Sequence, residues 1–127
     1  MNDKGWIGVD LDGTLAEYHG WDYTGGIGKA IPLMVERVKT WLLEGKTIKI
    51  FTARANRPEQ IVIIKKWLLD NNLPELEITN VKDLKMIELW DDRCVQVVPN
   101  TGIPISNVPT NIRSSVTLSR TAKSEED

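Results

Sequence analysis

Apolar positions along the chain alternate between the spacing of a buried strand and the spacing of an amphipathic helix. The short apolar run from Trp6 to Val9 predicts a strand that is buried on both faces. From Ile31 the apolar residues fall at helical spacing, with Pro32 suited to the first turn and Gly45 to the end of the helix. The apolar stripe of this helix consists of Ile31, Met34, Val35, Val38, Trp41 and Leu42.

The alternation continues through the middle of the chain. A second strand is predicted at 48–51, and Pro58 opens a second helix that Asn71 and Asn72 end. Further short apolar runs predict strands at 76–79, 86–90 and 95–98. Strands that alternate with helices of about 12 to 15 residues indicate βαβ units. We therefore expect an α/β fold with a parallel sheet of about five strands, flanked by helices and joined by right-handed crossovers.

Two segments do not follow this alternation. Residues 16–30 are rich in glycine, aromatic and polar residues, which indicates a long loop, and we expect this loop to form a flap. After Gly102 the chain becomes rich in serine, threonine, asparagine and charged residues, so we expect a mobile tail at 106–127. The 127 residues have the length of one domain, which we place at 1–105.

Composition and charge restrict the class of protein. Sixteen lysine and arginine residues against eighteen acidic residues give a net charge of −2, which argues against tight non-specific binding to nucleic acid. The single cysteine, Cys94, suits a reducing compartment, and we expect it to be a small buried apolar side chain. The polar N-terminus does not resemble a signal peptide, and no apolar run approaches the roughly 20 residues of a membrane span. We therefore expect a cytoplasmic protein with no membrane partner.

Acidic and hydroxyl side chains follow three of the predicted strands. The segments are Asp10-Leu11-Asp12-Gly13-Thr14-Leu15, Thr52-Ala53-Arg54 and Asp91-Asp92-Arg93. In an open parallel sheet, ligands bind beyond the carboxyl ends of the strands, so these segments should meet in space. Two carboxylates from each of two strands would make an oxygen-rich pocket whose natural cation is Mg²⁺, and phosphate oxygens are the usual partner of such an ion.

The residues around these carboxylates suit a phosphoryl group. Gly13 lets the backbone turn sharply and leaves N–H groups to receive an anion. Thr14 and Thr52 supply hydroxyls, and the segment Thr52-Ala53-Arg54 brings positive charge at Arg54. The glycines at 25–28 do not have Walker spacing, and a flexible flap is the preferred interpretation of that segment.

The ordered set of motifs resembles the haloacid dehalogenase superfamily of phosphohydrolases. Asp10 to Leu15 is similar to that family's DxDGT(L) signature, and the strand-terminal Thr52 and the acidic pair at 91–92 are similar to its other motifs. The resemblance spans roughly residues 6–98. It implies a Rossmann-like fold, and 16–30 leaves no room for a cap domain. The small capless members it resembles occur in bacteriophages and bacteria, and they accept exposed or macromolecular phosphates or borrow a wall from another subunit.

The resemblance also implies a role for each residue. Asp10 would be the nucleophile that forms an aspartyl-phosphate, and Asp12 the general acid and then the base. Thr52 would hydrogen-bond the phosphoryl group. Asp91 would bind Mg²⁺ together with Asp10 and the backbone carbonyl of Asp12, with Asp92 beside it.

The family's lysine has two candidates here. Lys82 follows directly on Ile78-Thr79-Asn80-Val81 of the third predicted strand and is preferred, and Lys85 is the alternative. The chain is thus expected to be a Mg²⁺-dependent phosphatase that acts on a phosphorylated substrate. A phosphotransferase or mutase of the same fold, and a non-catalytic protein that binds Mg²⁺ and phosphate, stay open as alternatives.

Overall fold

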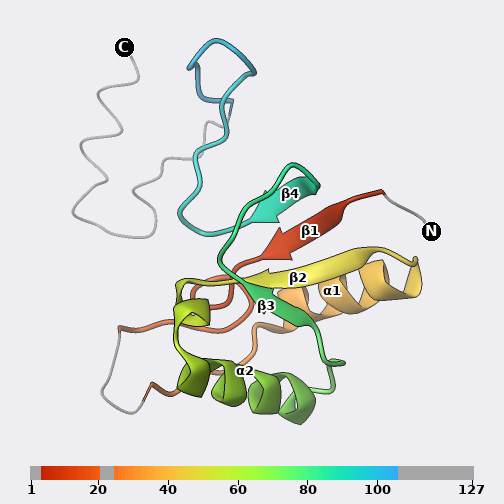
Figure 1. The fold of residues 1–127 in the computed structure, drawn as a ribbon, viewed down its shortest axis with the longest axis vertical. Coiled ribbons are helices and arrows are strands. Elements are labelled where there is room, and N and C mark those ends of the chain that lie inside the picture. The colour runs from red at the N-terminus through yellow and green to blue at the C-terminus, as the bar shows by residue number, and fades with distance from the viewer. Residues whose placement is uncertain (1–3, 21–24, 106–127) are drawn as a thin grey trace. The chain divides into compact units, whose positions relative to one another are not determined.

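The computed structural model describes residues 4–20 and 25–105 of the chain. Strands and helices alternate through the described residues in the predicted order (Figure 1). The elements are β1 (Trp6–Val9), α1 (Pro32–Leu43), β2 (Thr47–Phe51), the short 3-10 helix η1 (Ala53–Asn56), α2 (Pro58–Asp70), β3 (Glu77–Thr79) and β4 (Met86–Trp90). The tail predicted at 106–127 and part of the flap predicted at 16–30 lie outside the described residues.

The strands form a parallel sheet in the order β3-β2-β1-β4. β1 lies in the middle, where Ile7 pairs with Ile48 of β2 and Val9 pairs with Ile50. The prediction of an α/β fold with a parallel sheet and flanking helices is confirmed, with four strands among the described residues.

Both helices pack on the same face of the sheet. The core there joins side chains of all the central elements: Ile7 and Val9 of β1, Ile48 and Ile50 of β2, Met34, Val35 and Val38 of α1, and Ile64 and Leu68 of α2. On β4, Trp90 packs edge-to-face against Trp41 of α1, with ring centroids 5.1 Å apart. Burial of these apolar side chains against one sheet face is what fixes the helices behind the strands.

The residues that were predicted to begin and end the two helices lie at the helix ends in the structure. Pro32 and Pro58 each begin a helix, where a missing N–H costs nothing. α1 ends where the Gly45 N–H donates to the Leu42 carbonyl, and α2 ends at Asn71, whose side-chain amide donates to the Trp67 carbonyl. No helix within residues 4–20 and 25–105 is long and apolar enough to cross a membrane.

The segment between β3 and β4 contributes to the opposite face of the sheet. The indole N–H of Trp6, a side chain only 3% exposed, donates to the Asp83 carboxylate at 2.9 Å. This hydrogen bond, with the one from the Lys85 backbone N–H to the same oxygen, lowers the pKa of Asp83 below its ordinary value. The Lys49 ammonium lies 4.4 Å above the Trp6 ring and adds a cation–π contact.

Residues from Asp92 onward form a second compact unit, separate from the unit that ends at Asp91. In it, the Val98 N–H donates to the Ile103 carbonyl and the Ile105 N–H to the Gln96 carbonyl, around the predicted turn at 99–102. Only an isolated bridge joins Val97 to Pro104.

Two predictions for this second unit are wrong. The fifth strand expected at 95–98 does not form among the described residues, where this run is paired by one isolated bridge from Val97 to Pro104. Val97 is 47% exposed, so its apolar side chain is not buried as a core strand requires. Cys94 was expected to be buried, and it is exposed. The domain boundary placed at residue 105 stays a prediction.

Candidate active site

The direction of the chain connections reverses between β1 and β4. From β1 the chain moves outward to β2 and β3, and it then returns to place β4 on the other side of β1. In an open parallel sheet, such a reversal leaves a crevice at the carboxyl ends of the two strands, where ligands bind. Asp10 follows β1 at this point and Asp91 follows β4, and the Asp10 N–H donates to the Trp90 carbonyl at 2.9 Å.

The structure brings acidic side chains together at this reversal. Asp10 and Asp91 each offer a carboxylate oxygen, and these two oxygens lie within 4.8 Å of each other. Asp92, the other predicted ligand from this segment, is the first residue of the second unit, and its place in the site stays a prediction. Two carboxylates at that distance repel by roughly 3 kcal/mol at an effective dielectric constant of 20, and a shared cation would relieve the repulsion. Carboxylate oxygens are the ligands that Mg²⁺ prefers, so this pair fits the predicted ion.

The turn after β1 is fixed by its own backbone. Gly13 has a φ of 93°, in the region that favours glycine, and its N–H donates to the Ala16 carbonyl at 2.8 Å. The N–H groups of Leu15 and Ala16 both donate to the Leu11 carbonyl. The Gly13 N–H that was expected to receive an anion is therefore used within the turn. The Thr14 hydroxyl lies 3.4 Å from Asp10 Oδ2, which places it beside the predicted nucleophile.

The end of β2 positions the second predicted segment. The Thr52 N–H donates to the Thr79 carbonyl of β3, and the buried Thr52 hydroxyl accepts from the Arg54 N–H at 3.1 Å. This bond caps η1 at its first turn, where Ala53 is exposed. The hydroxyl still has its own proton to donate, so Thr52 keeps the capacity predicted for it.

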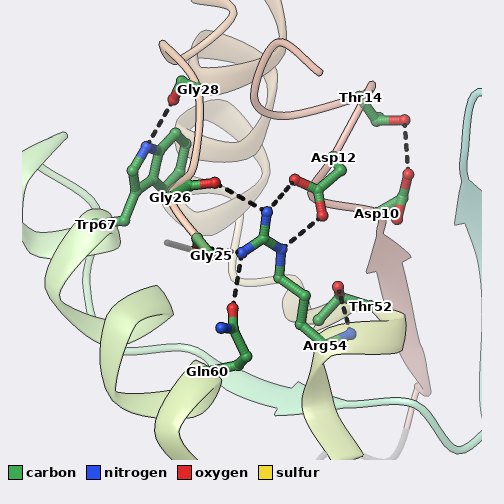
Figure 2. Close-up of polar contacts among 10 residues, drawn as sticks. All are labelled: Asp10, Asp12, Thr14, Gly25, Gly26, Gly28, Thr52, Arg54, Gln60 and Trp67. Carbon is green, nitrogen blue, oxygen red and sulfur yellow. Dashed lines mark hydrogen bonds and ion pairs between the residues drawn. The ribbon is translucent and has the colours of Figure 1, made fainter. Parts of the chain in front are cut away.

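Arg54 is buried and bound on every side (Figure 2). Its Nε donates to Asp12 Oδ2 at 2.7 Å and its Nη2 to Asp12 Oδ1 at 2.9 Å, a bidentate ion pair. Its Nη1 donates to the Gly25 carbonyl at 2.6 Å and to Gln60 Oε1 at 2.7 Å, and Nη2 also donates to the Gly26 carbonyl at 3.1 Å. The Asp12 side chain, expected near the metal, is absent from the acidic group at the reversal and is bound to Arg54 instead.

The residues that hold Arg54 were not predicted as part of the site. Gln60 is only 4% exposed on α2, and the carbonyls of Gly25 and Gly26 belong to the segment interpreted as a flexible flap. A further contact fixes this segment, because the Trp67 indole N–H of α2 donates to the Gly28 carbonyl at 2.9 Å. Gln60 precedes Ile64 by one helical turn, so a polar residue on the apolar face of α2 was the signal in the sequence.

The two candidate lysines lie on the connection from β3 to β4. Lys85 immediately precedes β4, and its carbonyl accepts from the Trp6 N–H at the start of β1. It therefore lies at the amino ends of the strands, about 16 Å of strand away from the edge that holds Asp10. Lys82 is exposed three residues beyond β3. The topology argues against Lys85, and the role of Lys82 stays a prediction.

Comparison with known proteins supports the fold of this chain but does not indicate an activity. No family model and no curated protein matches the chain. Among solved structures, the chain is similar to a conserved protein from Bacteroides thetaiotaomicron, with 25% sequence identity and a TM-score of 0.56, over 91% of each chain. That protein is described only as conserved, so the likeness supports the α/β architecture alone.

Proposed function

We propose that the protein is a Mg²⁺-dependent phosphatase of the haloacid dehalogenase type that hydrolyses phosphate monoesters through an aspartyl-phosphate on Asp10. The observation that carries the proposal is the meeting of the Asp10 and Asp91 carboxylates at the reversal between β1 and β4. The strand order β3-β2-β1-β4 supports a Rossmann-like fold. The short segment between β1 and α1 has too few residues for a cap domain, which favours exposed or macromolecular phosphates as substrates.

In this proposal the reaction has two steps, transfer of the phosphoryl group to Asp10 and its hydrolysis by water. An Asp10 oxygen bonds to phosphorus as the bond to the leaving group breaks, and Asp12 gives that group its proton. A water molecule then bonds to phosphorus, the bond to Asp10 breaks, and Asp12 takes the proton from the water. The hydroxyls of Thr14 and Thr52 donate to the phosphoryl oxygens, with Lys82 as their charged partner. Mg²⁺, held by Asp10 and Asp91 beside the Asp12 backbone carbonyl and Asp92, would offset the negative charge of the phosphoryl group.

Hydrolysis of p-nitrophenyl phosphate tests this proposal. We expect turnover by the native protein that requires Mg²⁺ and disappears in Asp10→Asn. Asp70→Asn is the matched control, because Asp70 is an exposed acid on α2 that pairs with Lys66, and its activity should equal that of the native protein. Turnover that survives in Asp10→Asn, or that needs no Mg²⁺, would contradict the proposal.

A second assay addresses the metal ligands directly. Asp91→Asn should weaken Mg²⁺ binding, measured by isothermal titration in the absence of substrate, because the variant removes one of two charged ligands. Mg²⁺ binding without turnover on a broad panel of phosphates would favour the non-catalytic binding protein. Transfer to an alcohol acceptor in preference to water would favour the phosphotransferase.

A further inference from the structure

Arg54 was predicted to contact the substrate phosphate, and its surroundings indicate a different role. A guanidinium has five N–H bonds, and five acceptors surround this one: both oxygens of Asp12, the carbonyls of Gly25 and Gly26, and Gln60 Oε1. The side chain is only 5% exposed. A phosphate could bind Arg54 only by displacing one of these acceptors, and each displacement would break a hydrogen bond to the buried guanidinium.

We infer that Arg54 is a positioning residue for Asp12, held by Gln60 and by the carbonyls of Gly25 and Gly26, and is not a ligand of the phosphoryl group. The inference rests on the proposed function, because Arg54 would act by positioning Asp12, the residue that accepts the proton from water. Nε and Nη2 bind both Asp12 oxygens, which fixes the plane of the carboxylate as well as its position.

The contacts of the guanidinium on the side away from Asp12 hold the guanidinium itself in place. Gln60 lies in the first turn of α2, and its Oε1 accepts from Nη1 at 2.7 Å, so the helix sets the place of the guanidinium. Gly25 closes the other side: its φ is 70°, and a Cβ there would lie 2.5 Å from Gln60 Nε2. No other residue type brings the 25–26 carbonyls this close to Arg54 without moving Gln60.

The step at which activity is lost distinguishes a positioning residue from a phosphate ligand. With p-nitrophenyl phosphate, nitrophenolate leaves with the electron pair of the broken bond and needs no proton, so Asp12 is required only for the attack of water on the phosphorylated Asp10. A misplaced Asp12 therefore slows the second step and lets the phosphorylated protein accumulate. A lost phosphate ligand weakens binding and slows the first step instead.

The test is stopped-flow kinetics of Arg54→Lys with p-nitrophenyl phosphate, with inorganic phosphate as the competing probe. Lysine keeps the charge but has three donors and no planar fork, so it cannot hold both Asp12 oxygens and the other acceptors. We expect kcat to fall on the order of 100-fold, the size of a positioned acid–base contribution, and KM to fall with it because only the second step is slowed. The ratio kcat/KM, which reports the first step, and the inhibition constant of phosphate should both stay within about threefold. One equivalent of nitrophenolate should appear in a burst, as in Asp12→Asn.

Two further variants keep the test decisive. Gln60→Met preserves the length of the side chain but removes the acceptor, and kcat should fall about tenfold with the same burst. Arg54→Lys combined with Asp12→Asn should be no slower than Asp12→Asn alone, because both changes act on one group. Arg57→Lys, at an exposed arginine just before α2, is the matched control and should behave as the native protein.

Several results would overturn the inference while leaving the proposed function standing. The first is a rise of more than tenfold in both KM and the phosphate inhibition constant of Arg54→Lys. The second is native activity in Arg54→Lys with no burst. The third is a Gln60→Met variant with native kinetics. If Arg54→Lys fails to fold, as judged by circular dichroism, Gln60→Met decides. If the native protein shows no Mg²⁺-dependent turnover that requires Asp10, the proposed function fails, and this inference fails with it.

Discussion

Replacing Arg54 with methionine should destabilise the folded protein strongly. Methionine fills a similar volume, so the change removes the buried guanidinium with little loss of packing. It leaves the Asp12 carboxylate without its bidentate partner, and it leaves Gln60 Oε1 and the carbonyls of Gly25 and Gly26 without the donors seen in Figure 2.

The magnitude follows from the burial of the two charged groups. Removing one partner of a buried ion pair costs about 3–5 kcal/mol, because the other charge is left uncompensated. The Arg54 side chain is 5% exposed and the Asp12 side chain 21% exposed, so water can still reach part of the carboxylate. We therefore expect a loss of about 3 kcal/mol in the free energy of unfolding, which corresponds to a fall of roughly 10 °C in Tm.

Urea unfolding followed by circular dichroism measures this loss. The midpoint should fall while the slope m stays unchanged, because the surface exposed on unfolding is nearly the same. The control Arg57→Met, at an exposed position, should lie within about 0.5 kcal/mol of the native protein. A loss below about 1 kcal/mol for Arg54→Met would refute the reasoning, since it would mean that the guanidinium is solvated and the network contributes little.

Two further predictions concern the two faces of the sheet. Leu68→Ala, at a fully buried position of α2, should cost about 2–5 kcal/mol in urea unfolding, whereas Leu69→Ala, at a position 64% exposed, should change stability by less than about 0.5 kcal/mol. Equal losses would contradict the packing of α2. Because the pKa of Asp83 is lowered in the folded protein, its ionised form stabilises the fold above the ordinary value of 3.8, and this contribution is lost as the pH falls through the lowered value. Trp6→Phe removes the indole N–H donor, so its stability deficit in urea unfolding should be larger at pH 7 than at about pH 2.5, and a deficit that grows on acidification would contradict this.

The elements predicted from local patterns were those whose side chains and backbone signals agree. Trp6–Val9 and Met86–Trp90 form strands with the predicted bounds, and α1 and α2 begin at the predicted prolines. At these places apolar spacing, proline at the first turn and glycine or asparagine at the end all favour one structure. The run at 95–98 has apolar spacing alone, and without a partner strand its backbone groups could not form a ladder.

The site was predicted in part, for the same kind of reason. That residues following parallel strands meet at one edge of the sheet is a general rule, so Asp10 and Asp91 could be placed together from the sequence. The rule does not say which side chains bind one another. The sequence predicted a phosphate contact for Arg54, whereas in the structure its five N–H groups bind Asp12, Gln60 and two glycine carbonyls.

The sequence by itself therefore determined the order of strands and helices, the parallel sense of the sheet and which segments reach its carboxyl edge, because these depend on local spacing and on the handedness of βαβ connections. The tertiary structure alone decided which acceptors surround Arg54, and that Lys85 lies at the wrong end of the sheet. A long charged side chain can reach any of several partners, and its choice depends on which of them are buried beside it. That burial exists only once α2 and residues 25–28 have packed together.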